Sequence, residues 1–403
     1  MDLYLMCKKT MSVFIRRCAD LRLLIVVTAM ACTAGTKAQD RLLSAGSTVE
    51  PALQKLAERL LNKKQGSIVA IEPSTGRVLC MASRDKLDSA NNRAVSEAYS
   101  PGSTFKTAQA LTMFSEGQIF ENTEYNCHEG FWVDNIHIGC HKHPSPLQLV
   151  QAIAQSCNSW FCKAFRDYIN NRALYPSKFR AIGTWNKYMR SMGFGQTIAL
   201  DISGENPGVL PDSAYLEQIH NGRWNGTTVM WNGMGQGEVK TTPLQLCNLA
   251  AVIANRGWYV SPHIRLDTEK DSSLLRRHHA LPTPQAFDVV ARGMRAAVIG
   301  GTCASINQQA FRMCGKTGTA ENIGEDHSIF IGYAPKEKPT VAVCVYVENA
   351  GFGADLAAPL GALIMEQHVM GRLSERSEKH AAQWAGFRVK ITPVEIPMSL
   401  DDF

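Results

Sequence analysis

Three short motifs built around a serine or a lysine follow one another along the chain. They are Ser103-Thr104-Phe105-Lys106, Ser156-Cys157-Asn158 and Lys316-Thr317-Gly318-Thr319. Acyl transfer through a serine needs a nucleophilic hydroxyl, a base beside it, and donors for the oxyanion that develops. Each motif alone is short enough to arise by chance, whereas all three in this order indicate a serine acyl-transfer site.

The first motif predicts a nucleophile and its base on one helix. The spacing favours a helix from Ser103 to Glu116 that ends before Gly117. Residues i and i+3 share a helix face, so Lys106 is expected beside the Ser103 hydroxyl. A lysine acts as a base only where burial and a second cation lower its pKa, and Lys316 is the candidate cation. The alternative is a surface helix with an incidental serine and lysine.

The second motif supplies two groups that can complete a proton network. Ser156 can relay a proton between Lys106 and a leaving amine, and the Asn158 amide can orient Lys106 or a substrate carbonyl. Taken alone, the same residues are more typical of a capping serine and a turn asparagine. Cys157 has no adjacent base and is interpreted as a small packing residue.

The third motif is predicted to bind substrate at the end of a strand. Lys316 and the hydroxyls of Thr317 and Thr319 can hold a substrate carboxylate. Gly318 has no side chain, which leaves room for a substrate backbone. The alternative is a strand-to-loop edge with an exposed lysine.

The twelve cysteines are scattered along the chain, and only Cys127 and Cys140 stand out, because His128, His141 and His143 lie close by. A zinc site is conceivable. The spacing is not that of a standard zinc finger, so a disulfide or two free thiols is favoured and no metal or other cofactor is predicted.

The pattern of apolar residues predicts an α+β fold, an antiparallel sheet flanked by helices with a mainly helical subdomain. Early strands at Ser67–Glu72 and Arg77–Ser83 form a hairpin, and a helical middle includes Pro243–Asn255. The remaining predicted elements are late strands at Phe311–Thr317, Ser328–Ala334 and Thr340–Glu348, and a closing helix at Leu356–Leu373.

The chain divides into four predicted parts. Residues 1–38 carry six basic and two acidic residues, and five of the basic ones precede an apolar run at residues 23–34, which indicates a signal or membrane-anchor segment. Thr36-Lys37-Ala38 resembles a cleavage site, and lipidation at Cys32 is a third interpretation. Residues 39–47 form a short linker, 48–373 the main domain and 374–403 a polar, loosely attached tail. Most of the formal charge of +6 lies in the first part, so no nucleic-acid surface is predicted.

The motifs in their wider context resemble the transpeptidase domain of class B penicillin-binding proteins, especially the penicillin-binding protein 2 (elongation) type. The likeness runs from about Thr48 to Arg372. Besides the three motifs it includes Val69-Ala70-Ile71-Glu72-Pro73, Gly235-Gln236-Gly237-Glu238, Thr242-Pro243-Leu244-Gln245 and Gly332-Tyr333-Ala334-Pro335.

This resemblance implies a role for each motif residue. Ser103 is the acylated nucleophile, Lys106 its base, and Ser156 and Asn158 complete the proton network. The backbone N–H groups of Ser103 and Thr319 resemble the family's oxyanion hole. The expected activity is a peptidoglycan D,D-transpeptidase on stem peptides, with β-lactams acylating the same serine and cell-wall elongation proteins as partners. The expected location is the periplasmic face of the inner membrane, or the periplasm if residues 1–38 are removed.

Two alternatives stay open. A β-lactamase or D,D-carboxypeptidase would use the same motifs but pass the acyl group to water, for which His327 and Glu321 are the candidate bases. A non-catalytic β-lactam-binding or interaction protein is the second, since the family's pedestal domain is missing between residues 38 and 48.

Overall fold

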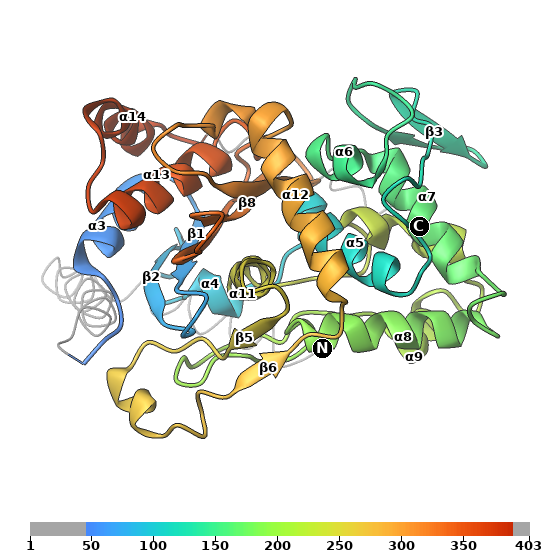
Figure 1. Ribbon diagram of the computed structural model, residues 1–403, viewed down its shortest axis with the longest axis horizontal. Helices are drawn as coiled ribbons and strands as arrows, with labels where there is room; N and C mark the ends of the chain where they lie inside the picture. Colours follow the sequence, from blue (N-terminus) through green and yellow to red (C-terminus); the bar gives the residue numbers. More distant parts are fainter. Residues whose placement is uncertain (1–45, 390–403) are drawn as a thin grey trace, which may run out of the picture.

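The computed structural model describes residues 46–389, which form an antiparallel sheet with helices on both faces (Figure 1). The sheet has five strands in the order β2-β1-β9-β8-β7, so β2 and β7 are its two edges. Its strands are β1 (Gly66–Ile71), β2 (Val78–Arg84), β7 (Cys314–Ala320), β8 (His327–Ala334) and β9 (Val341–Val347).

Two hydrophobic cores lie on opposite faces of this sheet. Side chains alternate along a strand, and in β9 the even-numbered residues such as Tyr346 join one core whereas the odd-numbered ones such as Val345 join the other. The first core packs against α11 and the helical subdomain, and the second against α3, α13 and one side of α12. These helices are α3 (Pro51–Leu60), α11 (Pro243–Ala254), α12 (Pro284–Gly300) and α13 (Ala357–Met370).

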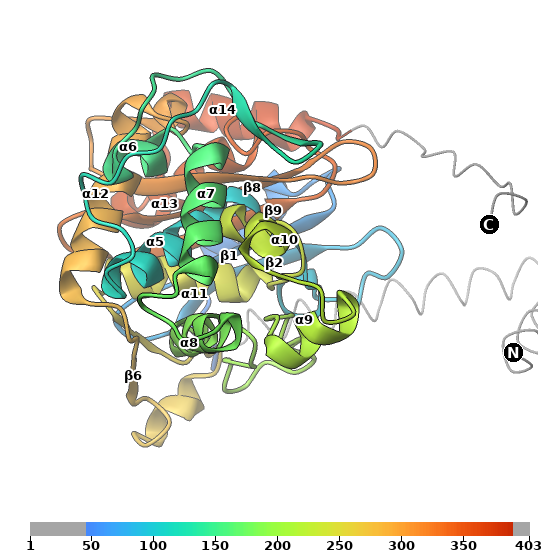
Figure 2. The ribbon, with the colours of Figure 1, turned by 90° about the vertical axis from the view of Figure 1, so that its right-hand side faces the viewer.

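The helical subdomain lies beyond α11, where α7 and α8 are prominent in Figure 2. It contains α5 (Lys106–Ser115), α6 (Leu149–Ala154), α7 (Asn158–Asn170), α8 (Lys178–Ser191), α9 (Ser213–Ile219), α10 (Gly226–Val229) and the 3₁₀ helix η2 (Met230–Met234). Smaller elements are α4 (Arg93–Ser96), hairpins β3–β4 (Gly130–Val133, Ile136–Gly139) and β5–β6 (Trp258–Val260, Arg277–His279), and the 3₁₀ helices η1 (Gly102–Phe105), η3 (Leu266–Lys270) and η4 (Ala304–Ile306).

The predicted α+β class is confirmed, with differences at some element boundaries. The strand expected at Phe311–Thr317 is β7, which begins and ends three residues later, at Cys314 and Ala320. The helix expected from Ser103 begins as the 3₁₀ turn η1 and becomes α-helical only at Lys106.

The expectation of a loosely attached tail from residue 374 is wrong for its first half. Residues Glu375–Gly386 form α14, and the Ser374 hydroxyl accepts the Ser377 N–H at its start. At its other end the fully buried Lys64 ammonium donates to the carbonyls of Trp384 (2.5 Å) and Phe387 (3.1 Å). A lysine at a helix C-terminus satisfies carbonyls that the helix itself cannot pair.

The predictions for the two chain ends concern residues outside the part that the structure describes. The predicted signal or anchor segment (1–38), most of the linker (39–47) and the last residues of the tail lie outside residues 46–389. Among the helices of residues 46–389, none has both the length and the hydropathy needed to span a bilayer.

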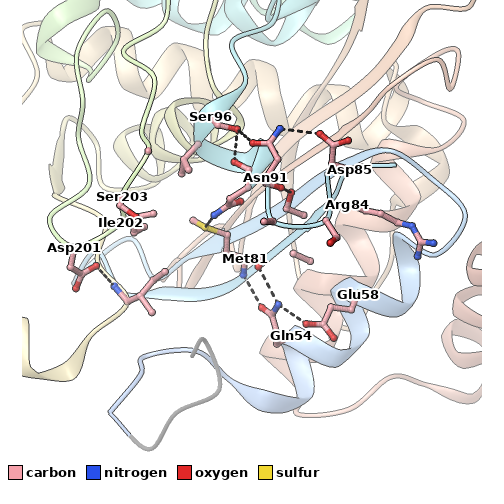
Figure 3. A pocket seen from close by; sticks show the side chains of 18 of the residues that line it. Gln54, Glu58, Met81, Arg84, Asp85, Asn91, Ser96, Asp201, Ile202 and Ser203 are labelled. Carbon is pink, nitrogen blue, oxygen red and sulfur yellow. Dashed lines mark hydrogen bonds between the residues drawn. The ribbon is translucent and has the colours of Figure 1, made fainter. Parts of the chain in front are cut away.

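The β2 edge of the sheet is covered by a side chain of α3. Gln54 is buried, and its amide oxygen accepts the Met81 N–H (2.9 Å) while its amide nitrogen donates to the Met81 carbonyl (3.1 Å). Next to this pair lies an open groove of about 1130 Å³, whose wall includes Asp85, Asn91 and Ser96 (Figure 3). The strand order puts this groove at the opposite edge of the sheet from the Lys316-Thr317-Gly318-Thr319 strand.

Candidate active site

Ser103 is the second residue of η1, in a turn that packs tightly against β7. The preceding residue, Gly102, has a φ of +53°, and a Cβ atom there would lie 2.5 Å from the Thr319 carbonyl oxygen and 3.2 Å from its nitrogen. Only glycine therefore fits this approach. Residues i and i+3 eclipse in a 3₁₀ turn, so Lys106 follows Ser103 on the same side, as predicted.

The Lys106 ammonium is held by the second motif. It donates to the Asn158 Oδ1 (2.6 Å), to the Ser156 carbonyl (2.7 Å) and, at a longer distance, to the Ser156 hydroxyl (3.3 Å). The Lys106 side chain is fully buried and lies over the Phe161 ring, 5.7 Å from its centroid. The structure thus brings together residues that lie about fifty positions apart in the sequence.

Burial is the main reason why the Lys106 side chain has a lower pKa than an ordinary lysine. Loss of hydration disfavours the charged form and lowers the pKa of Lys106 to about 8, although neighbouring thiols, Cys140 first, act in the opposite direction. The pKa of Lys316 is also lowered, first by burial and then by the charge of Lys106. The predicted repulsion between the two lysines thus acts chiefly on Lys316.

Ser156 adopts a backbone conformation that is rare for residues with a side chain. Its φ is +55°, in the turn between α6 and α7. Such strain persists where the surroundings fix it, and it often marks a functional site. Here the turn directs both the carbonyl and the hydroxyl of Ser156 toward Lys106.

The third motif lies on β7, the sheet edge next to η1 (Gly102–Phe105), which carries the predicted nucleophile Ser103 and is called the nucleophile turn below. The buried Lys316 ammonium donates to the Thr317 carbonyl (2.9 Å). The Thr317 hydroxyl donates to the Thr302 hydroxyl (2.6 Å), and the half-buried Thr319 hydroxyl accepts the Gly353 N–H at 3.4 Å. Thr317 and Thr319 are two residues apart on a strand and share a face, whereas Lys316 projects from the other.

The structure gives another reason for Gly318 than the predicted one. A Cβ atom at this position would lie 2.8 Å from the Thr104 Cγ2 atom, so the missing side chain makes room for η1. The glycine-rich segment after η2 closes the other side of the turn. The Gly102 N–H donates to the Gly235 carbonyl (2.8 Å), and the Gln236 amide reaches the Thr319 carbonyl (3.4 Å).

Residues 66–366, three quarters of the chain, match the family described as penicillin binding protein transpeptidase domain. The chain belongs to this family. The peptidoglycan D,D-transpeptidase MrdA of Acinetobacter baumannii is 26% identical over 417 residues, which cover 90% of this chain and 59% of that protein. The protein of the same name from Haemophilus influenzae is also 26% identical, over 81% of this chain and 56% of its own length. The chain therefore spans less than three fifths of these relatives.

Solved structures agree with the family assignment. Penicillin-binding protein 2 of Pseudomonas aeruginosa, in complex with WCK 5153, has a TM-score of 0.69 and 28% identity, over 82% of this chain and 80% of that one. The complex of penicillin-binding protein 2 with MreC from Helicobacter pylori gives a TM-score of 0.70 over 81% of this chain and 64% of that one. At 23% identity the second likeness shows the fold alone.

Beside the motifs, this transpeptidase domain contains a cluster that sequence reasoning did not assemble. One ligand atom from each of Cys127, Cys140, His143 and Cys157 lies within 4.8 Å of the others. Three sulfurs and an imidazole are a donor set for tetrahedral zinc, in which two sulfurs lie about 3.8 Å apart. Cys127 and Cys140 are free thiols rather than a disulfide, and Cys157 belongs to the cluster as well as to the core.

The cluster contacts the Ser156-Cys157-Asn158 motif directly. The Asn158 N–H donates to the Cys140 sulfur (3.3 Å), and the Asn158 amide nitrogen donates to the Gly139 carbonyl (2.9 Å). A hydrogen bond from the Cys157 thiol favours the thiolate of Cys140 and lowers its pKa, while the same contact raises the pKa of Cys157. In the sequence, Cys157 in the middle of the second motif was the signal that could have pointed to this cluster.

Proposed function

We propose that this chain is a peptidoglycan D,D-transpeptidase that cross-links stem peptides through an acyl-enzyme on Ser103. The observation that supports this most is the buried Lys106 ammonium, held by Ser156 and Asn158 one 3₁₀ turn after Ser103. A lysine that loses its proton near neutral pH is the base that a serine nucleophile needs.

The proposed reaction has two halves that use the same groups. Neutral Lys106 takes the proton of Ser103, whose oxygen attacks the penultimate D-alanyl carbonyl of a stem peptide. The Ser103 and Thr319 N–H groups stabilise the oxyanion. Ser156 passes a proton to the departing D-alanine amine, and an amine of a neighbouring stem then attacks the acyl-enzyme by the reverse route.

The edge strand β7 suits an extended peptide. Its backbone at Thr319 faces η1 rather than β8, as the close approach of Gly102 implies. A peptide or β-lactam that pairs with this edge would bring its carboxylate to the Lys316 charge. Such a charge-assisted contact adds roughly 1.5–3 kcal/mol of binding.

The alternative of a β-lactamase or D,D-carboxypeptidase needs a group that activates water. Of its two candidates, His327 accepts the Asn349 N–H at Nδ1 (3.0 Å) and lies edge-on to the Tyr99 ring, 6.1 Å between centroids. Glu321 is exposed just after β7. These contacts favour a structural role for His327, so we propose that water is activated poorly and that the acyl-enzyme persists.

Labelling with a fluorescent penicillin separates these functions. We expect one stable adduct per chain, located on Ser103 by mass spectrometry and absent from Ser103→Ala. Rapid release of hydrolysed penicillin would favour a β-lactamase, and the absence of any adduct would favour a non-catalytic interaction protein.

We also infer that Cys127, Cys140, His143 and Cys157 hold a structural zinc ion. Their donor types and mutual distances suit the metal. When bound, zinc would tie the segment around β3–β4 to the first turn of α7. The side chains at that turn, not the metal, carry the proton steps.

We further propose that the chain acts on the periplasmic face of the inner membrane, or in the periplasm if its N-terminal segment is cleaved, with cell-wall elongation proteins as partners. The basic and apolar N-terminal residues support export, and the Helicobacter pylori relative is described in complex with MreC. Fractionation of cells that express the full chain tests the location.

A further inference from the structure

A buried carboxylate behind the nucleophile turn collects hydrogen bonds from three parts of the chain. Glu348 follows the last residue of β9, and its side chain is only 10% exposed. It accepts from the Arg93 Nη2 (2.6 Å) and Nε (2.8 Å), from the Tyr99 hydroxyl (2.6 Å) and from the Gln65 amide (2.9 Å). None of these residues belongs to the three motifs.

Arg93 lies between two carboxylates. Besides Glu348 it pairs with Asp85, on the wall of the groove at the β2 edge (Figure 3). Asp85 also accepts the Leu87 N–H (2.8 Å) and the Asn91 amide (2.9 Å). The Arg93 guanidinium group is thereby held between two carboxylates that also accept other hydrogen bonds.

The network continues from Tyr99 to the nucleophile. The Tyr99 ring stacks on Tyr346, 4.3 Å between centroids, and its backbone pairs with Thr241 in both directions. The next residue, Ser100, accepts from the Lys240 ammonium at its hydroxyl (2.7 Å) and from the Tyr346 hydroxyl at its carbonyl (3.2 Å). Ser103 follows only three residues later.

Buried ion pairs contribute little to net stability, because the loss of hydration offsets most of the attraction. They do fix geometry, and an error of about 1 Å in placing reacting groups can slow a reaction about a hundredfold. The arrangement around Glu348 therefore fits a positioning role better than a stabilising one.

We propose that Glu348 is a positioning residue for the acyl-transfer reaction. Through the Tyr99 hydroxyl and Arg93 it holds the Tyr99–Gly102 segment, so that Ser103 faces Lys106 and the Thr319 N–H. The inference rests on the proposed function, because it assumes that Ser103 is acylated. It adds Glu348, Arg93 and Tyr99 to the residues on which acylation depends.

The test compares two tyrosine variants of the full chain. Tyr99→Phe keeps the stacked ring and removes only the hydroxyl. Tyr175→Phe is the matched control, since the Tyr175 hydroxyl also donates to a glutamate, Glu116, at 2.6 Å. The concentration dependence of fluorescent-penicillin labelling gives the acylation rate constant and the dissociation constant of the preceding complex separately.

We expect Tyr99→Phe to lower the acylation rate constant at least about tenfold, with a dissociation constant within about twofold of the wild type. Tyr175→Phe should change neither. Glu348→Gln, which keeps shape but removes the charge, should slow acylation in the same way. Its melting temperature shows whether the variant remains folded.

Each other result overturns the proposal. Equal acylation rates for the two tyrosine variants would show that the hydroxyl does not position Ser103. Unfolding of both Tyr99→Phe and Glu348→Gln would make the network a stability element instead. A wild-type chain that is not labelled at all would instead refute the proposed function, and this inference with it.

Discussion

The lowered pKa of Lys106 predicts a specific pH dependence of acylation. With a pKa of about 8, the fraction of Lys106 in the neutral, basic form is roughly 1% at pH 6, 9% at pH 7, 50% at pH 8 and 91% at pH 9. An exposed lysine would be neutral only to about 0.03% at pH 7. Acylation should therefore rise nearly tenfold from pH 6 to pH 7 and less than twofold from pH 8 to pH 9.

The assay is the rate constant of fluorescent-penicillin labelling at each pH, with the melting temperature followed in parallel. Lys316 is buried near Lys106 and has a lowered pKa too, so the observed midpoint belongs to the pair of lysines. The variant Asn158→Asp tests whether Lys106 sets this midpoint. It puts a carboxylate where an amide oxygen lies 2.6 Å from the Lys106 ammonium. An opposite charge at this distance should raise the midpoint by roughly 1–3 units.

The same shift predicts how stability depends on pH. Between about 8 and the ordinary value of 10.5, Lys106 is largely neutral in the folded chain and protonated in the unfolded one. The unfolded chain binds more protons in this window, so the free energy of unfolding should rise with pH through it.

Acylation that is flat between pH 6 and pH 9, or that still rises steeply above pH 9, would refute Lys106 as a base tuned by burial.

Three further predictions concern the surroundings of Lys106. Lys316→Ala should slow acylation by carboxylated β-lactams about 10- to 150-fold, the equivalent of roughly 1.5–3 kcal/mol; equal loss with a ligand that lacks the carboxylate would contradict its role. Cys140→Ser should abolish the zinc measured by mass spectrometry of the purified metal-loaded protein, whereas Cys247→Ser, outside the cluster, should retain it; an unchanged zinc content would remove Cys140 as a ligand. Gly318→Ala should destabilise the fold by about 1–3 kcal/mol through overpacking against the nucleophile turn, while thermal melts of Gly139→Ala, where a Cβ meets nothing within 4 Å, should match the wild type.

Local sequence rules were enough to predict the strands of the sheet, and the order of the motifs is read directly from the sequence. The hairpin expected at Ser67–Ser83 is β1–β2, because two short apolar runs and the Pro-Ser-Thr-Gly turn between them act over short range. The strand expected at Phe311–Thr317 was three residues too early at both ends, and it stopped just before Gly318, a residue type that weakens strands. The missing side chain of Gly318 makes room for Thr104, and that of Gly315 makes room for the Phe330 ring, contacts that no local rule contains.

The same limit explains what was missed in the site. Cys127 and Cys157 meet only because the β3–β4 hairpin folds back over α7, and the sequence offered no standard zinc spacing. Glu348 lies 249 residues from Tyr99, so only the tertiary fold reveals their contact. Helix α14 was missed for a different reason: its polar composition hid a capping Ser374 and two acidic residues in its first turn, which were available signals.

The two edges of the sheet carry different risks of self-association. An exposed edge strand can pair with any extended chain, including another copy of the same protein. At β2 the Gln54 amide already occupies the backbone groups of Met81, so a second molecule cannot extend the sheet there without displacing a buried side chain. Of the two edges, only β7 then keeps backbone groups for an extended peptide, so any pairing with a second copy through this sheet would have to compete with that peptide for the same strand.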